Sequence, residues 1–304
     1  MAQRSRVLVS IAVVLASFVG CGGDSSSDSG SDPSSPASEG AATFDAPVPS
    51  DAKAYPVFVS SELVVGPNRM LVGLLDSNDA PIGSPRIELD VDLYDLAESA
   101  DEPVTSARLD FIEIQTSVRG YYAGQVEFPS AGKWGAEVNI TGEGLDETVR
   151  GSIEVKKESS TPSLGARPPA SKTPTASDAR RIADISTDKK PDPRFYEMSI
   201  AEAIRSGEPA VVVFATPQFC SSQVCGPTLD IVKGVSKDFP RVNFVHVEPY
   251  DLTKVPDLEP VPSVLEWGLP GEPWIFVTDR KGRIAAKFEA VIAPQELSRV
   301  LAGL

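Results

Sequence analysis

Residues 210–227 read AVVVFATPQFCSSQVCGP, and this stretch decides the fold around it. The run 210–214 is wholly apolar and rich in valine, which predicts a strand buried on both faces. Cys220 and Cys225 follow this run, and Pro227 suits the first turn of a helix. Two thiols so close in sequence act together, so they exchange electrons, hold a metal or bridge a loop.

Helices and strands are predicted to alternate on both sides of this stretch. Ser199 and Glu202 have the spacing of a capping box, which predicts the start of a helix that ends at Gly207. The other predicted elements are a helix after the cysteines, strands at 242–248, 274–279 and 284–290, and a last helix from Pro294. The pattern is that of an α/β domain.

This order of elements, with two cysteines between a buried strand and a helix, resembles the thioredoxin superfamily. The resemblance covers about residues 197–304 and includes WGLPGEPWIFVTDRKGRI, in which Pro273 falls on the cis-proline of the family. It implies an α/β thioredoxin-like domain over 197–304. It also implies that Cys220 is the exposed nucleophile and Cys225 the resolving cysteine, while Pro273 shapes the groove for a partner chain.

The cysteine motif departs from the thioredoxin pattern in two respects. Four residues separate the cysteines instead of two, and in a helix five positions would turn the side chains about 140° apart. We therefore expect residues 221–224 to loop out ahead of the helix and to bring the two Cα atoms within about 7 Å. The family's buried acid is also absent from 210–214, so His246 or Glu248 is expected to replace it in proton transfer.

Metal binding and a permanent structural bridge are the alternatives to redox chemistry. Two thiolates and one imidazole suit Cu(I) or zinc, and His246 is the chain's one histidine. Copper-delivery proteins of the thioredoxin fold also combine a cysteine pair with a histidine, so the alternative metal set is Cys220, Cys225 and His246. The main prediction remains thiol–disulfide exchange with protein thiols or disulfides of the cell envelope, with no cofactor and no metal.

The N-terminus predicts export and a lipid anchor. Two arginines precede an apolar run of roughly fourteen residues, 7–20, which is shorter than the ~20 residues of a membrane-spanning helix. Residues 1–20 are therefore predicted to be a signal peptide. Gly20 followed by Cys21 resembles the cleavage box of bacterial lipoproteins, which implies a lipidated Cys21 at the mature N-terminus. The expected location is the extracytoplasmic side of the cell membrane, with the lipid bilayer as a partner.

Composition restricts the remaining partners and the redox state. The 304 residues carry a formal charge of −15, which argues against nucleic acid as a partner. With Cys21 assigned to the lipid, Cys220 and Cys225 are the only possible pair among three cysteines. Thiols outside the cytosol tend to be oxidised, so we expect a disulfide between them.

The region between anchor and cysteines divides into three parts. Residues 21–43 are rich in serine and glycine and lack large apolar side chains up to their end, which predicts a disordered tether. Residues 44–157 contain about seven short alternating runs, which predict an immunoglobulin-like β-sandwich with Trp134 in its core. That sandwich is expected to be a spacer or binding module, because it contains no histidine for a catalytic triad. Residues 158–196 are rich in proline and predict an extended linker.

Overall fold

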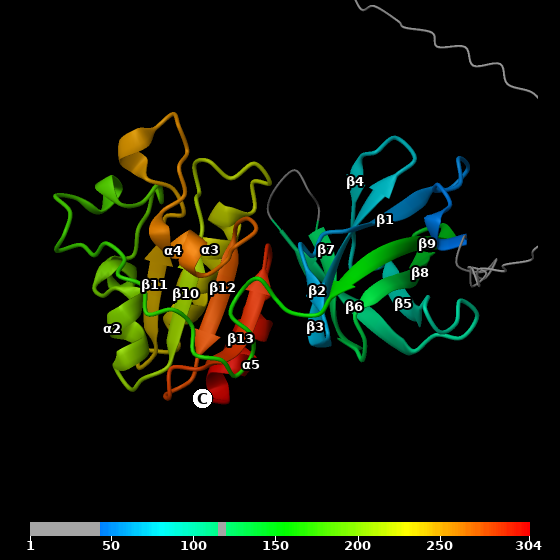
Figure 1. Ribbon diagram of the computed structural model, residues 1–304. Helices are drawn as coiled ribbons and strands as arrows, with labels where there is room; N and C mark the ends of the chain where they lie inside the picture. Colours follow the sequence, from blue (N-terminus) through cyan, green and yellow to red (C-terminus); the bar gives the residue numbers. More distant parts are fainter. Residues whose placement is uncertain (1–42, 115–119) are drawn as a thin grey trace, which may run out of the picture. The chain divides into compact units, whose positions relative to one another are not determined.

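The structure is a computed structural model that describes residues 43–114 and 120–304 (Figure 1). The predicted signal peptide at 1–20, the lipidated Cys21 and residues 21–42 of the tether lie outside the described residues. Within the described part of the chain, no helix is both long and apolar enough to cross a bilayer.

The first half of the described chain is built of β-strands, as the alternating runs predict. Its elements are η1 (Thr43–Asp45), β1 (Ala54–Phe58), β2 (Leu63–Val64), β3 (Gly66–Asp76), β4 (Pro81–Ile82), β5 (Glu88–Asp95), β6 (Thr105–Glu113), β7 (Gly120–Phe128), β8 (Gly132–Gly142) and β9 (Leu145–Lys156). The strands follow the spatial order β1-β3-β7-β6-β5-β8-β9-β2, with β4 beside β3. The prediction of an all-β first domain is confirmed.

Strand β6 turns the sheet back on itself. Its first part, Thr105–Leu109, pairs with β5, whereas its last part, Asp110–Glu113, pairs with β7. The ladder therefore changes partner in the middle of one strand, and the sheet curls around its own inner face. At this corner Gly124 lies against β6: a Cβ on Gly124 would come 2.5 Å from the Leu109 side chain and 2.7 Å from the Arg108 carbonyl oxygen. Only glycine allows the strands to approach so closely.

The inner face of the curled sheet is the hydrophobic core. Four apolar residues alternate from the position before β5 into the strand, and all are buried in one cluster with residues of β3, β7 and β8; they are Ile87, Leu89, Val91 and Leu93. Trp134 is fully buried, and its ring packs against that of Phe128 in a T-shaped arrangement at a centroid distance of 4.9 Å. Its predicted place in the core is confirmed.

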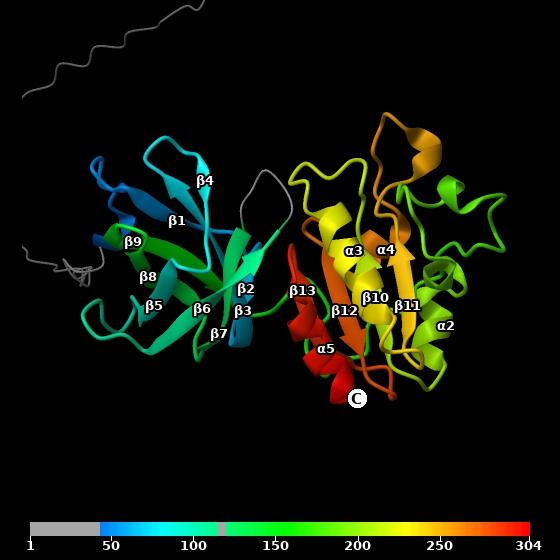
Figure 2. The same ribbon diagram turned by 180° about the vertical axis from the view of Figure 1, so that it is seen from behind.

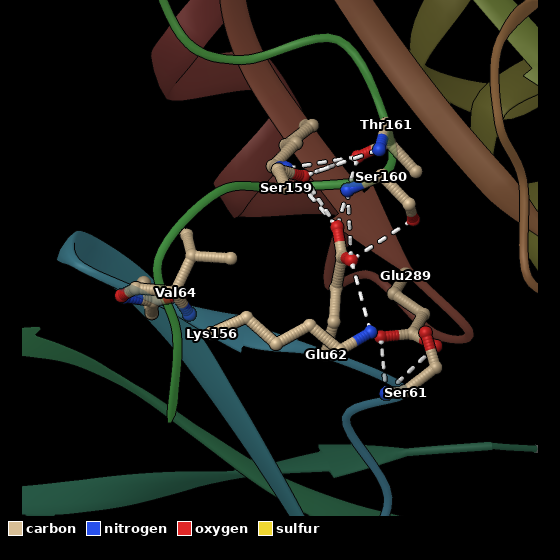
Figure 3. Close-up of polar contacts among 10 residues, drawn as sticks. Ser61, Glu62, Val64, Lys156, Ser159, Ser160, Thr161 and Glu289 are labelled. Atoms are coloured by element: carbon tan, nitrogen blue, oxygen red, sulfur yellow. Dashed lines mark hydrogen bonds and ion pairs between the residues drawn. The ribbon is translucent and has the colours of Figure 1, made fainter. Parts of the chain in front are cut away.

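A polar cluster forms where β9 runs into the following segment (Figure 3). The Glu62 carboxylate accepts hydrogen bonds from the Ser160 backbone N–H at 3.0 Å and from its hydroxyl at 2.9 Å, and the Ser159 hydroxyl also donates to it. The Nζ atom of Lys156 lies 3.7 Å from Oε2 of Glu62. Burial raises the pKa of Glu62, but the hydroxyl and N–H donors outweigh it and the net shift is downward. The carboxylate stays ionised and links the residue before β2 to the segment that follows β9.

The second half of the chain combines a sheet with helices. Its elements are η2 (Ile182–Asp184), η3 (Pro193–Tyr196), α2 (Ile200–Arg205), β10 (Ala210–Phe214), α3 (Cys225–Ser236), β11 (Asn243–Val247), η4 (Leu252–Lys254), α4 (Pro262–Glu266), β12 (Trp274–Thr278), β13 (Ile284–Glu289) and α5 (Pro294–Ala302). The four strands follow the order β11-β10-β12-β13, in which β10 is parallel to β11 and antiparallel to β12.

Strand β10 is buried on both faces because helices cover both sides of this sheet. Val211 and Val213 pack with apolar residues of α3 and α5, which Figure 2 shows in front of the sheet. The alternate residues, which include Val212 and Phe214, pack with residues of α2 and with Trp267. All five residues of β10 are buried, as the apolar run predicts. The predicted capping box is also present, since Ser199 and Glu202 bond reciprocally at the start of α2.

The proline-rich segment predicted as a linker lies against the second sheet for part of its length. The backbone of Gly165 donates to Ile284 at the start of β13 with an N···O distance of 2.7 Å. Ser171 is buried and accepts a hydrogen bond from the Trp267 indole N–H at 3.1 Å. Near its end, Phe195 and Tyr196 belong to the core that β10 shares with α3. This part of the chain is therefore packed against the same sheet that carries the cysteines.

Candidate functional site

The two cysteines form a disulfide at the junction between β10 and α3. Their Cα atoms lie 6.1 Å apart. The chain loops out between them: the Cys220 N–H donates to Thr216, the Gln223 N–H donates to Cys220, and Gln223 has φ 58. Helix α3 begins only at Cys225, so the expected loop ahead of the helix is present.

The two sulfurs have different surroundings. Cys225, the first residue of α3, is fully buried in the core that this helix covers. Cys220 is partly exposed, and its Sγ lies 3.2 Å from the hydroxyl of Ser222. A partner could therefore reach Cys220 but not Cys225, which is the division between attacking and resolving sulfur that disulfide exchange requires.

Apolar residues of two other segments pack against Val224, the last residue of the cysteine loop. Val224, next to Cys225, is buried in a cluster with Ile112 and Ile114 at the end of β6 and Val291 after β13. This packing fixes the residue that immediately precedes the first turn of α3. The position of the buried sulfur is therefore set by the core and not by the loop alone.

Pro273, the third predicted site residue, directly precedes β12. The Glu272–Pro273 peptide bond is cis, and Pro273 is buried. Glu272 brings a carboxylate close to the sulfurs: one oxygen of Glu272 and the Sγ atoms of both cysteines lie within 4.8 Å of one another. The sequence reasoning missed Glu272, although its place directly before Pro273 could have indicated it.

Tyr250 holds the Glu272 carboxylate in place. Its hydroxyl donates to Glu272 Oε2 at 3.1 Å. Burial raises the pKa of Tyr250, and the nearby Glu272 charge raises it further, so this hydroxyl keeps its proton. The carboxylate beside the disulfide therefore has a fixed orientation.

His246, the predicted alternative metal ligand, lies in the core and does not join this group. It is 4% exposed, its Nε2 lies 2.8 Å from the Ala215 carbonyl oxygen, and its Nδ1 lies 2.7 Å from the Tyr196 hydroxyl. Nε2 therefore donates and Nδ1 accepts. Burial lowers the pKa of His246 from 6.5 to about 4. Both nitrogens of the neutral ring are occupied within the protein.

Glu248, the predicted substitute for the buried acid of the thioredoxin family, directly follows β11 and is also buried. Its Oε2 accepts from the Thr187 N–H at 2.8 Å and from the Thr187 hydroxyl at 2.7 Å. Its Oε1 makes no hydrogen bond of ordinary geometry with any described residue. Burial raises the pKa of Glu248. Polar groups of Thr216 and Thr187 lower this pKa, repulsion from Glu272 raises it, and the net shift is upward. The negative charge of Glu272, which lies beside the disulfide, therefore also acts on Glu248.

A cavity of about 350 Å³ opens beside Glu248 and His246. Ser263, whose buried hydroxyl makes no hydrogen bond to any described residue, also lines it, together with Tyr250. Tyr250, one of the lining residues, also donates a hydrogen bond to Glu272, which lies next to the disulfide. The polar groups around the site are thus Glu248, Tyr250 and Glu272.

Comparisons with known proteins find similarity to solved structures alone, and this similarity is weak. No protein-family model matches it, and no curated protein matches it. Solved structures similar to part of the chain include a DUF4426 family protein from Pseudomonas aeruginosa PAO1, at 11% identity over 38% of this chain and 100% of that one, with a TM-score of 0.26. Two others are the Lin-41 filamin domain, at 13% identity over 35% and 95% with a TM-score of 0.23, and the Escherichia coli adhesin FdeC, at 17% identity over 43% and 38% with a TM-score of 0.23.

Proposed function

We propose that this protein is a membrane-tethered, extracytoplasmic thioredoxin-like protein that exchanges disulfides through Cys220 and Cys225. The observation that carries the proposal is the disulfide between a partly exposed sulfur and a fully buried one at the first residue of α3. A bridge that serves stability alone has no need for a reachable sulfur. The reachable sulfur of Cys220 is bonded to the first residue of α3, and the N-terminus of a helix favours thiolates near it.

The exchange reaction uses the two sulfurs in turn. In the reduced protein the Cys220 thiolate attacks one sulfur of a partner disulfide, forms a mixed disulfide and releases one partner thiolate. The Cys225 thiolate then attacks the Cys220 sulfur, restores the internal disulfide and releases the second partner thiolate. Two electrons pass to the partner, which takes up two protons, and the reverse sequence oxidises a partner dithiol.

Helix α3 supplies the positive potential for this step. Residues 215–230 contain no lysine or arginine, so the free N–H groups at the start of the helix are the main source of thiolate stabilisation in this loop. Glu272 acts in the opposite direction, because a carboxylate near a sulfur disfavours its thiolate form. We expect a nucleophile of moderate reactivity.

The other parts of the chain fit the same proposal. The curled sheet serves as an immunoglobulin-like spacer or binding module, and the segment 21–43 as a flexible tether. A lipid on Cys21 holds the protein at the outer side of the membrane, where its partners are protein thiols and disulfides of the cell envelope. Support for these assignments comes from the sequence patterns and from the all-β architecture of residues 43–156.

Equilibration with glutathione tests the proposal. Reduced protein mixed with glutathione disulfide should form the internal disulfide, with a reduction potential less negative than about −300 mV. In Cys225→Ser the reaction should stop at a stable glutathione adduct on Cys220, detectable by mass, whereas Cys220→Ser should form no such adduct at a comparable rate. A potential far below about −300 mV, or a disulfide that resists reduction until the chain unfolds, would show that the bridge is structural.

A further inference from the structure

The carboxylate of Glu272 gives the cysteine pair a third possible metal ligand. Across residues 43–114 and 120–304, this is the one place where three side chains of the types His, Cys, Asp and Glu bring ligand atoms so close, within 4.8 Å of one another. His246 contributes nothing to this group, because its ring nitrogens are bonded to Ala215 and Tyr196.

The sheet fixes the distance between the three ligands. Phe214 at the end of β10 pairs with Trp274 at the start of β12. The cysteine loop, which follows β10, and Glu272, which precedes β12, therefore lie at the same end of two neighbouring strands. Tyr250 donates to Glu272 Oε2, and Oε1 accepts no hydrogen bond from a described residue. One carboxylate oxygen is therefore positioned by a neighbour while the other is free to bind, as is common for metal-binding carboxylates.

We propose that the reduced protein binds Zn²⁺ through the Cys220 and Cys225 thiolates and the Glu272 carboxylate. The inference rests on the proposed function in one respect, namely that the disulfide can be reduced. A partner dithiol supplies two electrons and two protons and becomes a disulfide, which leaves two thiols on this chain. Zinc binding then releases two protons from these thiols and forms two Zn–S bonds and one Zn–O bond.

Charge and donor type both favour zinc. Two thiolates and a carboxylate place three negative charges together, and no lysine or arginine occurs between residues 215 and 230 to compensate them. Magnesium and calcium prefer oxygen ligands throughout, and Cu(I) is satisfied by the two sulfurs without the carboxylate. Zinc uses all three groups and leaves a fourth tetrahedral position open for water or a partner's sulfur.

Reduction therefore controls binding. In the oxidised protein the sulfurs are bonded to each other and offer no thiolate, so one carboxylate remains and cannot hold the metal alone. In a tetrahedral site with Zn–S bonds of about 2.3 Å the two sulfurs lie about 3.8 Å apart, and the three ligand atoms already lie within 4.8 Å of one another. The site is a metal centre that exists in one redox state of the protein.

Zinc titration of the full chain in detergent, without oxygen and against a chromophoric chelator, tests the proposal. The reduced protein should bind one Zn²⁺, and the oxidised protein none. Glu272→Gln should weaken binding by at least about tenfold, since even the loss of a residue that supports a ligand costs 10–100-fold. Glu259→Gln, which alters an exposed carboxylate paired with Lys254, is the matched control and should bind like the wild type. Co²⁺ in place of zinc should give the thiolate charge-transfer bands of a tetrahedral site.

Three results would overturn the proposal: equal affinity of Glu272→Gln and wild type, zinc binding by the oxidised protein, or binding retained in the Cys220→Ser, Cys225→Ser double variant. Circular dichroism of each variant shows whether a loss of binding reflects unfolding. The glutathione experiment is run without metal, so the two proposals fail independently. A disulfide that only a strong chemical reductant opens would end the exchange proposal, while zinc binding by the reduced chain would still be measured.

Discussion

His246 is held in a neutral form that a histidine on the surface would not keep at low pH. Burial lowers its pKa from 6.5 to about 4, and its hydrogen bonds to Ala215 and Tyr196 need one nitrogen with a proton and one without. Protonation in the folded protein would place a charge in the core and remove the acceptor that Tyr196 requires. The ring therefore stabilises the fold only in its neutral state.

This depressed pKa predicts a loss of stability in acid. Between pH 6.5 and 4 the unfolded chain binds a proton at His246 that the folded chain does not, so the free energy of unfolding falls as the pH falls through this window. The pKa difference corresponds to about 2 kcal/mol between pH 7.5 and pH 5. Urea unfolding at both pH values should show that His246→Gln loses less stability than the wild type by about this amount. Glu248, whose raised pKa gives the opposite slope, is present in both proteins and cancels. Identical pH dependence of the two proteins would contradict the prediction.

Residues of the site differ in how far the sequence indicated them. Cys220 and Cys225 stand out by type and spacing, and Pro273 by the resemblance of the segment around it. Glu272 does not, because the chain has 43 acidic residues and most acidic side chains lie on protein surfaces. Its closeness to the sulfurs depends on the pairing of Phe214 with Trp274, which brings together residues far apart in the chain.

Strand β6 is the element on which the curled sheet depends, because it pairs with β5 through one part and with β7 through the other. Gly124 on β7 allows this change of partner, since a Cβ would overlap Leu109 and approach the Arg108 carbonyl oxygen. We expect Gly124→Ala to lower the free energy of unfolding by about 1–3 kcal/mol through overpacking.

A second glycine provides the control for Gly124→Ala. Gly234 lies within α3, and a Cβ there would meet no atom within 4 Å. Gly234→Ala should therefore raise stability by about 0.5–1 kcal/mol, because alanine loses less backbone entropy in a helix. Urea titrations of both variants measure the contrast. A Gly124→Ala protein as stable as the wild type would mean that the corner relaxes without cost.

The apolar pattern of the sequence predicts strands well where one or both of their faces are buried, and it predicts the ends of elements less well where tertiary packing sets them. The alternation along β5 and the apolar run of β10 both correspond to observed strands. Helix α3 begins at Cys225, two residues before the proline expected in its first turn, and ends at Ser236. The buried contacts of Val224 and Cys225 fix that start, and they come from segments distant in sequence.

For the molecule as a whole, the proposed tether and the acidic body act together. The formal charge of −15 repels anionic lipid headgroups, so electrostatics would keep the folded part away from the bilayer to which we propose that a lipid on Cys21 attaches it. The tether that we propose for residues 21–43 would permit such separation. Cys220 could then reach partners above the membrane instead of being pressed against it.

The last prediction concerns this attachment and the two roles of cysteine in the chain. The apolar run 7–20 is too short to span a bilayer as a helix, and Cys21 follows it directly, so we expect a lipid on Cys21 to be the sole anchor. Cys21→Ser should move the protein from the detergent phase to the aqueous phase in phase partitioning. The Cys220→Ser, Cys225→Ser double variant changes two cysteines without touching the anchor and should remain in the detergent phase. If Cys21→Ser stays with the membrane, another part of the chain binds it, and the tether proposal is wrong while the disulfide chemistry is unaffected.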